Sequence, residues 1–272
     1  MSLTVSRTRR WVGDRLVLAF ALLVLLYMLL PVGVVILMSF NQPAGRQSYS
    51  FDAFTLDNWT NICGPYQLCD SVTNSIQIGF LATVVATALG TLMAFAMARH
   101  RFLGRSVANV GIFLPMASPE IVLGSSLLAL FVAAGFSGQL GFWTVFVAHV
   151  MFCLSFVVVT VKARLAGLDP RLEQAAMDLY ANEWQTFWRV TFPLVFPGIL
   201  AAALLSFSLS FDDFIITNLV SGQTVTFPMF VWGAAQRGIP PQINVVGTIM
   251  FLLALGLVVV GELNARRRLG RR

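Results

Sequence analysis

The stretch that decides the fold is LEQAAMDLYANEWQTFWRVTFP, residues 172–193, a polar and helix-prone segment between two long apolar runs. Its pattern predicts two short helices. Asp169 can cap the first, with Pro170 at the first helical position, where a missing N–H costs nothing. The second is expected to carry three aromatic residues on one face: Trp184, Phe187 and Trp188. A water-facing loop with such a face is expected to dock onto another protein.

The two ends of the second helix are also marked in the sequence. Asn182 can cap its start, and Gln185 three residues later completes a capping-box pattern. Pro193 has no backbone N–H and is expected to end the helix. We assign the whole loop to residues 165–193.

Apolar residues dominate the rest of the chain. Of its 272 residues, 57% are hydrophobic and 11% are charged, with a mean hydropathy of +0.80, which excludes a soluble globular protein. Pro115 and Pro119 interrupt the third of its long apolar runs, and an aspartate pair interrupts the fifth. The sequence predicts an all-α membrane domain over residues 16–263. Its six apolar runs are long enough to cross about 30 Å of hydrocarbon: 16–40, 76–98, 106–133, 142–161, 196–220 and 245–263.

Basic residues indicate the orientation of these runs. All but two of the 18 lysines and arginines fall in the tails 1–15 and 264–272, in the connection between the second and third runs, or in and beside the 165–193 loop. The two on the other side are Arg46 and Arg237. Because positive residues favour the cytoplasmic side, both termini and the loop are predicted to be cytoplasmic. This topology explains the net charge of +6, which gives no argument for a nucleic-acid partner.

Cysteines and histidines offer little chemistry. Cys63 and Cys69 lie in the predicted first outer loop, where a structural disulfide between them is one of two open alternatives. Cys153 is interpreted as a small apolar residue of the fourth run. His100 and His149 are isolated from one another and from other ligand types, so no metal site is expected.

The chain lacks the residues for ATP hydrolysis. A phosphate-binding P-loop needs Gly-Lys-Ser or Gly-Lys-Thr, whereas the single lysine, Lys162, follows Val161. No nucleophile–base constellation lies on the predicted water-exposed segments. We therefore expect a non-catalytic membrane subunit that holds no cofactor itself and takes its energy from another subunit.

The 172–193 segment resembles the EAA loop of ABC importer permeases, a pattern of E-A-A, three residues, G, nine residues and I-x-L-P. Gln174 stands where the family has Glu, with Glu173 beside it. Tyr180 replaces the glycine of the turn, and a positive φ costs tyrosine about 1 kcal/mol or more relative to glycine. Either the turn differs here or Asn182 takes the strained position. In full, the matching residues are Gln174-Ala175-Ala176, then Tyr180, then Val190-Thr191-Phe192-Pro193.

This resemblance implies the type I ABC importer permease fold, with six transmembrane helices in the inner membrane of a prokaryote. Expected partners are a dimer of ATPase subunits that binds ATP and Mg²⁺, a second similar permease, an extracellular solute-binding protein and the lipid bilayer. ATPase motion is expected to reach the spans through the loop and to drive alternating access. The residues expected to couple the two are Glu173, Gln174, Ala175, Ala176, Asp178, Tyr180, Trp184, Phe187 and Pro193.

Three carboxylates lie inside the apolar runs: Glu120, Asp212 and Asp213. A charge at the bilayer centre costs roughly 2.5–3.5 kcal/mol, so such residues are expected to face a cavity or a partner. At a rise of 1.5 Å per residue, Glu120 and Asp212 lie about 21 and 24 Å from the cytoplasmic ends of their runs. They are predicted to form one acidic collar, beside aromatic residues suited to cation–π contact: Phe207, Phe211, Phe214 and Trp232.

Adjacent helical residues differ in direction by about 100°, so only one of Asp212 and Asp213 is expected to line a solute path. Two other roles stay open, because a carboxylate can also pair with an arginine of a partner subunit or cap a helix broken near Pro119. The aspartate that does not line the path is expected to make a structural bond to a nearby hydroxyl: Ser208, Ser210 or Thr217.

The run FSLSFDDF, residues 207–214, looks like the S-L-S-x-D-D-F segment of spermidine/putrescine-type permeases within the ABC importers. Pro119-Glu120 and Thr226-Phe227-Pro228 are similar to that branch as well. The resemblance implies a polyamine as the solute. The alternatives are an importer for ferric iron, another cation or an amino-acid-like compound, and an ion-driven secondary carrier in which Glu120 and Asp212 relay protons.

Overall fold

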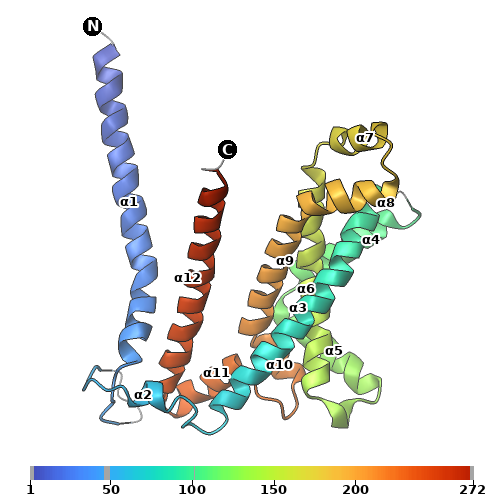
Figure 1. The fold of residues 1–272 in the computed structure, drawn as a ribbon. Coiled ribbons are helices and arrows are strands. Elements are labelled where there is room, and N and C mark those ends of the chain that lie inside the picture. Colours follow the sequence, from blue (N-terminus) through green and yellow to red (C-terminus); the bar gives the residue numbers. More distant parts are fainter. Residues whose placement is uncertain (1–2, 46–49, 101, 270–272) are drawn as a thin grey trace. The chain divides into compact units, whose positions relative to one another are not determined.

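The computed structural model describes residues 3–45, 50–100 and 102–269, and these are built almost wholly from helices (Figure 1). Within these ranges the one β-type pairing is an isolated bridge between Asn41 and Phe54, so the predicted all-α class is confirmed. The chain divides into a large unit of residues 67–232 and a small unit of residues 1–66 with 233–272. Four arginines that contribute to the predicted orientation lie outside the described residues: Arg46, Arg101, Arg271 and Arg272.

The small unit contains α1 (Leu3–Met38), α2 (Asp57–Thr60) and α12 (Gln242–Leu269), with the end of α11 (Phe227–Arg237). α1 packs on α12, and it includes most of the stretch predicted as the 1–15 tail. Asn58 fixes the loop that follows α1, because its side-chain amide donates to the carbonyls of Ser39 and Asn41 at 3.1 and 2.8 Å. The apolar part of α1 is unburied within this unit, as expected of a helix that faces lipid or a partner.

The large unit is centred on three mutually packed helices, α3 (Leu68–Arg99), α6 (Phe142–Ala166) and α9 (Phe192–Asp212). Small residues allow α3 to approach α6 closely. A Cβ atom added at Gly90 of α3 would lie only 2.7 Å from the Cβ of Val157 on α6. Close backbone approach through small residues is how helices associate inside a membrane, where burial from water supplies no force between them.

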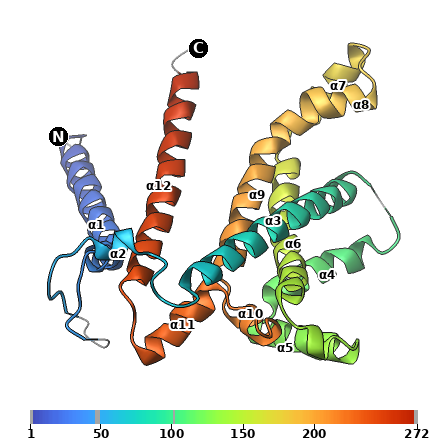
Figure 2. The same ribbon diagram turned by 60° about the horizontal axis from the view of Figure 1, so that its bottom comes forward.

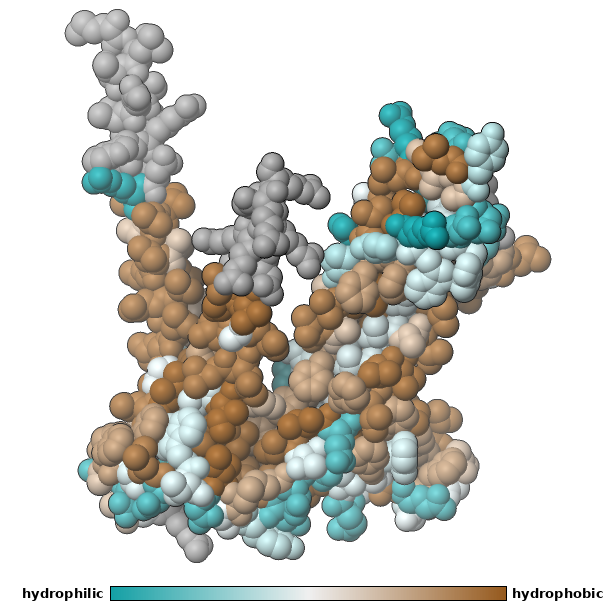
Figure 3. All heavy atoms as spheres, viewed as in Figure 1, coloured by the Kyte–Doolittle hydropathy of each residue, from teal (hydrophilic) through white to brown (hydrophobic). Residues whose placement is uncertain are grey.

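Shorter helices surround this centre. α5 (Glu120–Ala133) lies against α10 (Ile215–Val220) (Figure 2). Gly124 makes the contact possible, because a Cβ there would lie 2.8 Å from Leu219 Cδ1 and 3.2 Å from Ile216 Cα. Apolar residues cover the long helices, whereas hydrophilic residues gather around α7 and α8 (Figure 3). The shorter elements are α4 (Arg105–Ala117), α5 (Glu120–Ala133), a 3-10 turn (Ser137–Gln139), α7 (Arg171–Asp178), α8 (Glu183–Thr186) and α10 (Ile215–Val220).

Among the described residues, five helices are long and apolar enough to cross a membrane, and six if the bent pair α4 and α5 counts as one span. The predicted third run, 106–133, is therefore not one straight helix, since its halves meet at 110°. A proline forces the residue before it out of the helical region, and Ser118 before Pro119 is extended, with ψ at 138°. Pro119 thus marks the break as expected. Pro115 does not interrupt the run, because it lies inside α4, and the sharp bend was not predicted.

The predicted fifth run, 196–220, also needs correction. The crossing helix begins at Glu183 and ends at Asp212, and residues 215–220 form the separate helix α10. The cause is Asp213, whose carboxylate accepts a hydrogen bond from the backbone N–H of Thr217 at 2.8 Å. An aspartate that satisfies the free N–H groups of a helix start favours a new helix there.

Candidate functional site

Two polar regions of the large unit bring the predicted functional residues together. The first, here called the helix-break site, surrounds the carboxylates Glu120, Asp212 and Asp213. α9 ends at Asp212 and α10 begins at Ile215. Asp213 therefore lies in an extended link between two helices, with φ at −64° and ψ at 123°.

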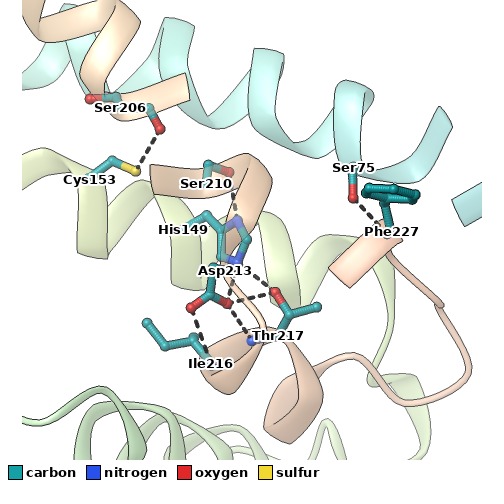
Figure 4. A network of polar contacts seen from close by, with 9 residues as sticks. All are labelled: Ser75, His149, Cys153, Ser206, Ser210, Asp213, Ile216, Thr217 and Phe227. Atoms are coloured by element: carbon teal, nitrogen blue, oxygen red, sulfur yellow. Dashed lines mark hydrogen bonds and ion pairs between the residues drawn. The ribbon is translucent and has the colours of Figure 1, made fainter. Parts of the chain in front are cut away.

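Asp213 is buried in a polar network (Figure 4) and is only 7% exposed. Its Oδ2 accepts hydrogen bonds from the N–H and the hydroxyl of Thr217, both at 2.8 Å. Its Oδ1 accepts a longer one from the N–H of Ile216, at 3.4 Å. Nε2 of His149 lies 3.3 Å from Oδ2. Both carboxylate oxygens are thus used to fix the start of α10 and the ring of His149.

His149 of α6 is a site residue that the sequence analysis missed. Its ring is 1% exposed, with Nε2 at 2.9 Å from the Thr217 hydroxyl and Nδ1 at 2.7 Å from the Ser210 hydroxyl. Because the Thr217 hydroxyl donates its hydrogen to Asp213, it accepts one from Nε2. In a neutral ring Nδ1 then accepts from the Ser210 hydroxyl. The ring therefore ties α6 to both α9 and α10. The sequence did contain one sign of this role, which is a histidine with two polar ring nitrogens inside an apolar run.

Asp212 and Glu120 are exposed, in contrast to Asp213. Asp212 is the last residue of α9 and Glu120 is the first residue of α5. Since α5 packs on α10, the two helix breaks lie together. The negative charges of both aspartates therefore act on the carboxylate of Glu120. One half of the expected division is therefore observed, since Asp213 makes the structural bond, to Thr217. Asp212 keeps its carboxylate exposed.

Aromatic rings accompany the helix-break site. The rings of Phe214 and Trp232 are 5.3 Å apart, and Trp232 is exposed. Phe211 lies 6.0 Å from Phe207 and 6.1 Å from Phe227. The predicted aromatic set therefore forms two neighbouring groups, one on each side of Asp212 in sequence.

The segment that precedes α11 is fastened to α3. The N–H of Phe227 donates to the hydroxyl of Ser75 at 2.9 Å, and the amide of Asn74 donates to the carbonyl of Val225 at 3.0 Å. Phe227 also contacts Phe211 of α9. One end of α3 is thereby connected to the aromatic residues of the helix-break site.

The second polar region is the 165–193 loop, here called the EAA-like loop. It contains two short helices as predicted, α7 and α8. The Asp169 carboxylate accepts a hydrogen bond from the N–H of Arg171 at 3.0 Å, and α7 begins at Arg171, one residue later than expected. The capping box is confirmed, since Asn182 and Gln185 each accept from the other's backbone N–H, at 2.8 and 3.1 Å.

The structure contradicts both expectations for the turn between α7 and α8, which were a different turn or a strained Asn182. The φ of Tyr180 is +63°, whereas Asn182 has an ordinary φ of −74°. Tyr180 itself therefore takes the left-handed conformation that the family's glycine adopts without strain. The helix end requires this conformation, because the N–H of Ala181 donates to the carbonyl of Ala176, as in a Schellman motif. The tyrosine side chain is 98% exposed, so no packing offsets the strain.

Replacing Tyr180 with glycine is expected to stabilise the folded protein by about 1 kcal/mol, because glycine has no Cβ to clash at positive φ. The measurement is the thermal unfolding midpoint of the purified permease, with an expected rise of about 2–4 °C. Leu179→Gly is the matched control, since Leu179 is exposed and has φ at −88°. Equal midpoints for the two variants would contradict strain at Tyr180.

Pro193 does not end the second helix, contrary to the prediction. α8 continues through a π-helical turn, η2 (Phe187–Thr191), into α9, and the continuous helix covers Glu183–Asp212. In this turn the N–H of Phe192 donates to the carbonyl of Phe187, five residues earlier. The wider turn accommodates a proline, which lacks an N–H and whose ring clashes with the carbonyl four residues back in a regular helix.

The aromatic face of the EAA-like loop is present. Trp184, Phe187 and Trp188 form a cluster with ring centroids 5.2–6.4 Å apart. Phe187 also meets Phe95 of α3 at 5.4 Å, whereas Trp184 is 69% exposed. Phe187 thus anchors the loop to the helices, whereas the ring of Trp184 is exposed.

Glu173 points back toward the helices. Arg99 at the end of α3 holds its carboxylate with both terminal nitrogens, and the Thr191 hydroxyl donates to Oε1 at 2.6 Å. These residues line a cavity of about 590 Å³ between α3, α7 and α8. Sequence reasoning did not identify Arg99, because it lies 74 positions from Glu173. The other predicted coupling residues of α7 and its turn face outward, with Ala176 half-buried: Gln174, Ala175, Ala176, Asp178 and Tyr180.

The cysteines and His100 are the remaining residues considered in the sequence analysis. Cys63 and Cys69 are disulfide-bonded, whereas Cys153 has a free thiol 3.4 Å from the carbonyl of Ser206. His100 lines the cavity beside Arg99. In the part of the chain that the structure describes, no group of three His, Cys, Asp or Glu residues is placed to hold a metal ion.

Comparisons with known proteins bear on the identity of the chain. Residues 86–267 match the family described as "Binding-protein-dependent transport system inner membrane component". The chain is 36% identical over 250 residues to the spermidine/putrescine transport system permease protein PotC of Haemophilus influenzae, which covers 92% of this chain and 96% of that protein. It is 38% identical over 190 residues to the putrescine transport system permease protein PotI of Escherichia coli, at 68% and 67% coverage.

Solved structures share the fold at low identity. A bacterial ABC transporter involved in the import of alginate superposes with a TM-score of 0.63 at 17% identity, over 96% of this chain and 97% of that one. The MetNI methionine ABC transporter superposes with a TM-score of 0.57 at 15% identity, over 72% and 93% of the two chains. The predicted importer-permease fold is thereby confirmed.

Proposed function

The chain belongs to the family of binding-protein-dependent transport system inner membrane components, the permeases of ABC importers, and from this we propose that it conducts polyamines into the cell. In this proposal the chain supplies the path and the coupling loop but no catalysis. A dimer of ATPase subunits binds ATP and Mg²⁺, a second permease completes the path, and an extracellular binding protein delivers the solute.

The observation that carries the solute proposal is the exposed carboxylate of Asp212 at the break between α9 and α10. Glu120 lies at the adjoining break, and both are exposed. Carboxylates inside a membrane domain favour a cationic solute, and the Phe214 and Trp232 rings supply faces for cation–π contact with an ammonium group. Polyamines are flexible chains of such groups. The printed names of two relatives, PotC and PotI, support the same solute class.

The proposed coupling runs through α3. At one end Arg99 holds Glu173 of the EAA-like loop, and at the other Ser75 and Asn74 hold the segment that leads to Phe227 beside the helix-break site. We place the EAA-like loop on the cytoplasmic side, where the exposed Trp184 and the apolar side chains of Leu179 and Tyr180 offer a docking face for the ATPase. ATPase closure then moves the loop and α3 together, and the path alternates between its two openings.

The test is uptake of labelled spermidine and putrescine by cells that lack this gene, restored with the native chain or with Asp212→Asn. The variant is expected to reduce uptake at low solute concentration roughly ten- to a hundredfold. This is the change in affinity expected when one charge-assisted hydrogen bond of about 1.5–3 kcal/mol is lost. Asp57→Asn is the control, because Asp57 is exposed on α2 of the small unit and is not part of the helix-break site.

Two outcomes would overturn the proposal. Unchanged polyamine uptake in the deletion strain, with no other polyamine importer present, would assign the permease to another solute. Uptake abolished by an uncoupler while cellular ATP is maintained would indicate an ion-driven carrier instead.

A further inference from the structure

Two hollows meet at the end of α6 that carries the EAA-like loop. One, of about 310 Å³, lies between the ends of α3, α4 and α6, and three cationic side chains line it: Arg99, Arg105 and Lys162. The other, of about 260 Å³, is an apolar groove between α4 and α6. Lys162 and Ala166 line both, so the cationic hollow opens into the groove. The cationic hollow shares Arg99 with the cavity beside Glu173, but its other lining residues differ, and neither hollow is lined by a carboxylate of the helix-break site.

Two of the three cations lack a counter-charge. Arg99 is paired with Glu173. Lys162 donates to the neutral amide oxygen of Asn109 at 2.7 Å, and neither it nor Arg105 forms an ion pair with any residue that the structure describes. Asp169 also lines the hollow, where its carboxylate accepts from the N–H of Arg171. With Arg99 neutralised, these side chains leave the hollow a net charge of about +1, and a half-buried cation at a membrane surface requires an anion.

The start of α4 adds to this preference. No side chain caps α4, whose N-cap is Gly104 at φ +90°. The free N–H groups of a helix start and the positive end of its dipole attract an anion. Arg105, the first residue of α4, lines the hollow. Both the side-chain charge and the backbone therefore favour an anion at one place.

The apolar groove continues from this place along both helices. On α4, Asn109 and Ile112 follow Arg105 at intervals of about one turn, and on α6, Val159 and Val158 lie one turn further into the span than Lys162. Each helix thus carries a stripe that is polar at the loop end and apolar beyond it. The apolar lining consists of Ile112, Phe113, Val158, Val159, Ala163 and Ala166.

We propose that this is a binding site for an anionic phospholipid with one phosphodiester charge, such as phosphatidylglycerol. The phosphate lies between Arg105 and Lys162 at the start of α4, and an acyl chain fills the groove between α4 and α6. Basic pockets between transmembrane helices on the cytoplasmic side are suited to anionic headgroups. An apolar helix of a second permease matches the groove but leaves the two cations without a counter-charge, so the charge favours the lipid.

The experiment is native mass spectrometry of the purified transporter complex, reconstituted with equal amounts of phosphatidylglycerol and phosphatidylcholine. The native complex is expected to retain one phosphatidylglycerol that Arg105→Gln with Lys162→Gln loses at least tenfold more readily. The matched control is Arg189→Gln, which removes an exposed charge from the same end of the unit but from neither hollow. The control complex is expected to retain the lipid.

A second variant tests the groove without changing charge. Ala163 is exposed and lines the groove, so Ala163→Trp is expected to fill it and to displace the lipid while both cations remain. Addition of inorganic phosphate is expected to leave the bound lipid in place, whereas displacement by phosphate would identify a simple anion site and overturn the proposal. Equal retention by all variants would overturn it as well, and so would a cross-link from Ala163→Cys to a second permease.

Discussion

A permease with alanine in place of Asp213 is expected to lose about 3–5 kcal/mol of folding free energy, because several buried hydrogen-bond donors lose their acceptor at about 1–3 kcal/mol each. Since whole proteins are stable by about 5–15 kcal/mol, this loss is a large fraction of the total, and the amount of folded protein in the membrane is expected to fall several-fold. The reason is that Asp213 accepts hydrogen bonds from Thr217 and Ile216 and faces His149. Its loss leaves these donors buried without an acceptor.

The neighbouring aspartate is the matched control for this experiment. Asp212→Ala removes the same group one position away, from an exposed side chain, and is expected to leave folding intact while impairing uptake. The measurement is the amount of each variant in the membrane, together with its thermal unfolding midpoint in detergent. Equal midpoints for Asp213→Ala and Asp212→Ala would show that the buried network does not support the fold.

The sequence predicted that the two aspartates have different roles, but it did not predict which of them makes the structural bond. Adjacent helical positions cannot face one path, so one aspartate had to turn inward. Which one does so depends on His149, which approaches from α6, and its contact with Thr217 spans 68 positions of sequence. Local patterns carry no information on such contacts. The one usable sign was that a ring with two polar nitrogens lies in an apolar run.

The membrane helices likewise show some features that the sequence predicted and others that it did not. Lengths of apolar runs located the membrane helices, because hydrocarbon thickness sets a minimum length. The 110° bend between α4 and α5 was not predictable, because α5 packs at Gly124 on residues of α10 that are distant in the sequence. Pro193 shows the limit of a local rule, since the π-helical turn before it removes the clash on which the rule rests.

A second large effect is expected where Arg99 meets Glu173. Glu173→Arg places two guanidinium groups face to face at the junction of α3 and α7, and it is expected to reduce uptake tenfold or more. This expectation rests on the proposed coupling through α3. The carboxylate is held by both terminal nitrogens of Arg99 and by the Thr191 hydroxyl, a bidentate geometry that is specific as well as strong. Uptake and ATPase activity of the assembled transporter are to be measured together, so that lost coupling is separated from lost assembly.

The charge exchange Arg99→Glu with Glu173→Arg decides between two roles for Glu173. If the carboxylate acts through Arg99, the double variant restores the attraction and is expected to recover a large part of the uptake that either single variant loses. If Glu173 instead contacts the ATPase directly, as the EAA resemblance alone suggests, the exchange leaves that contact broken and uptake stays low. The coupling between the two positions in this double-mutant cycle therefore measures the interaction itself. An additive result would assign Glu173 to the ATPase interface and would remove Arg99 from the coupling route.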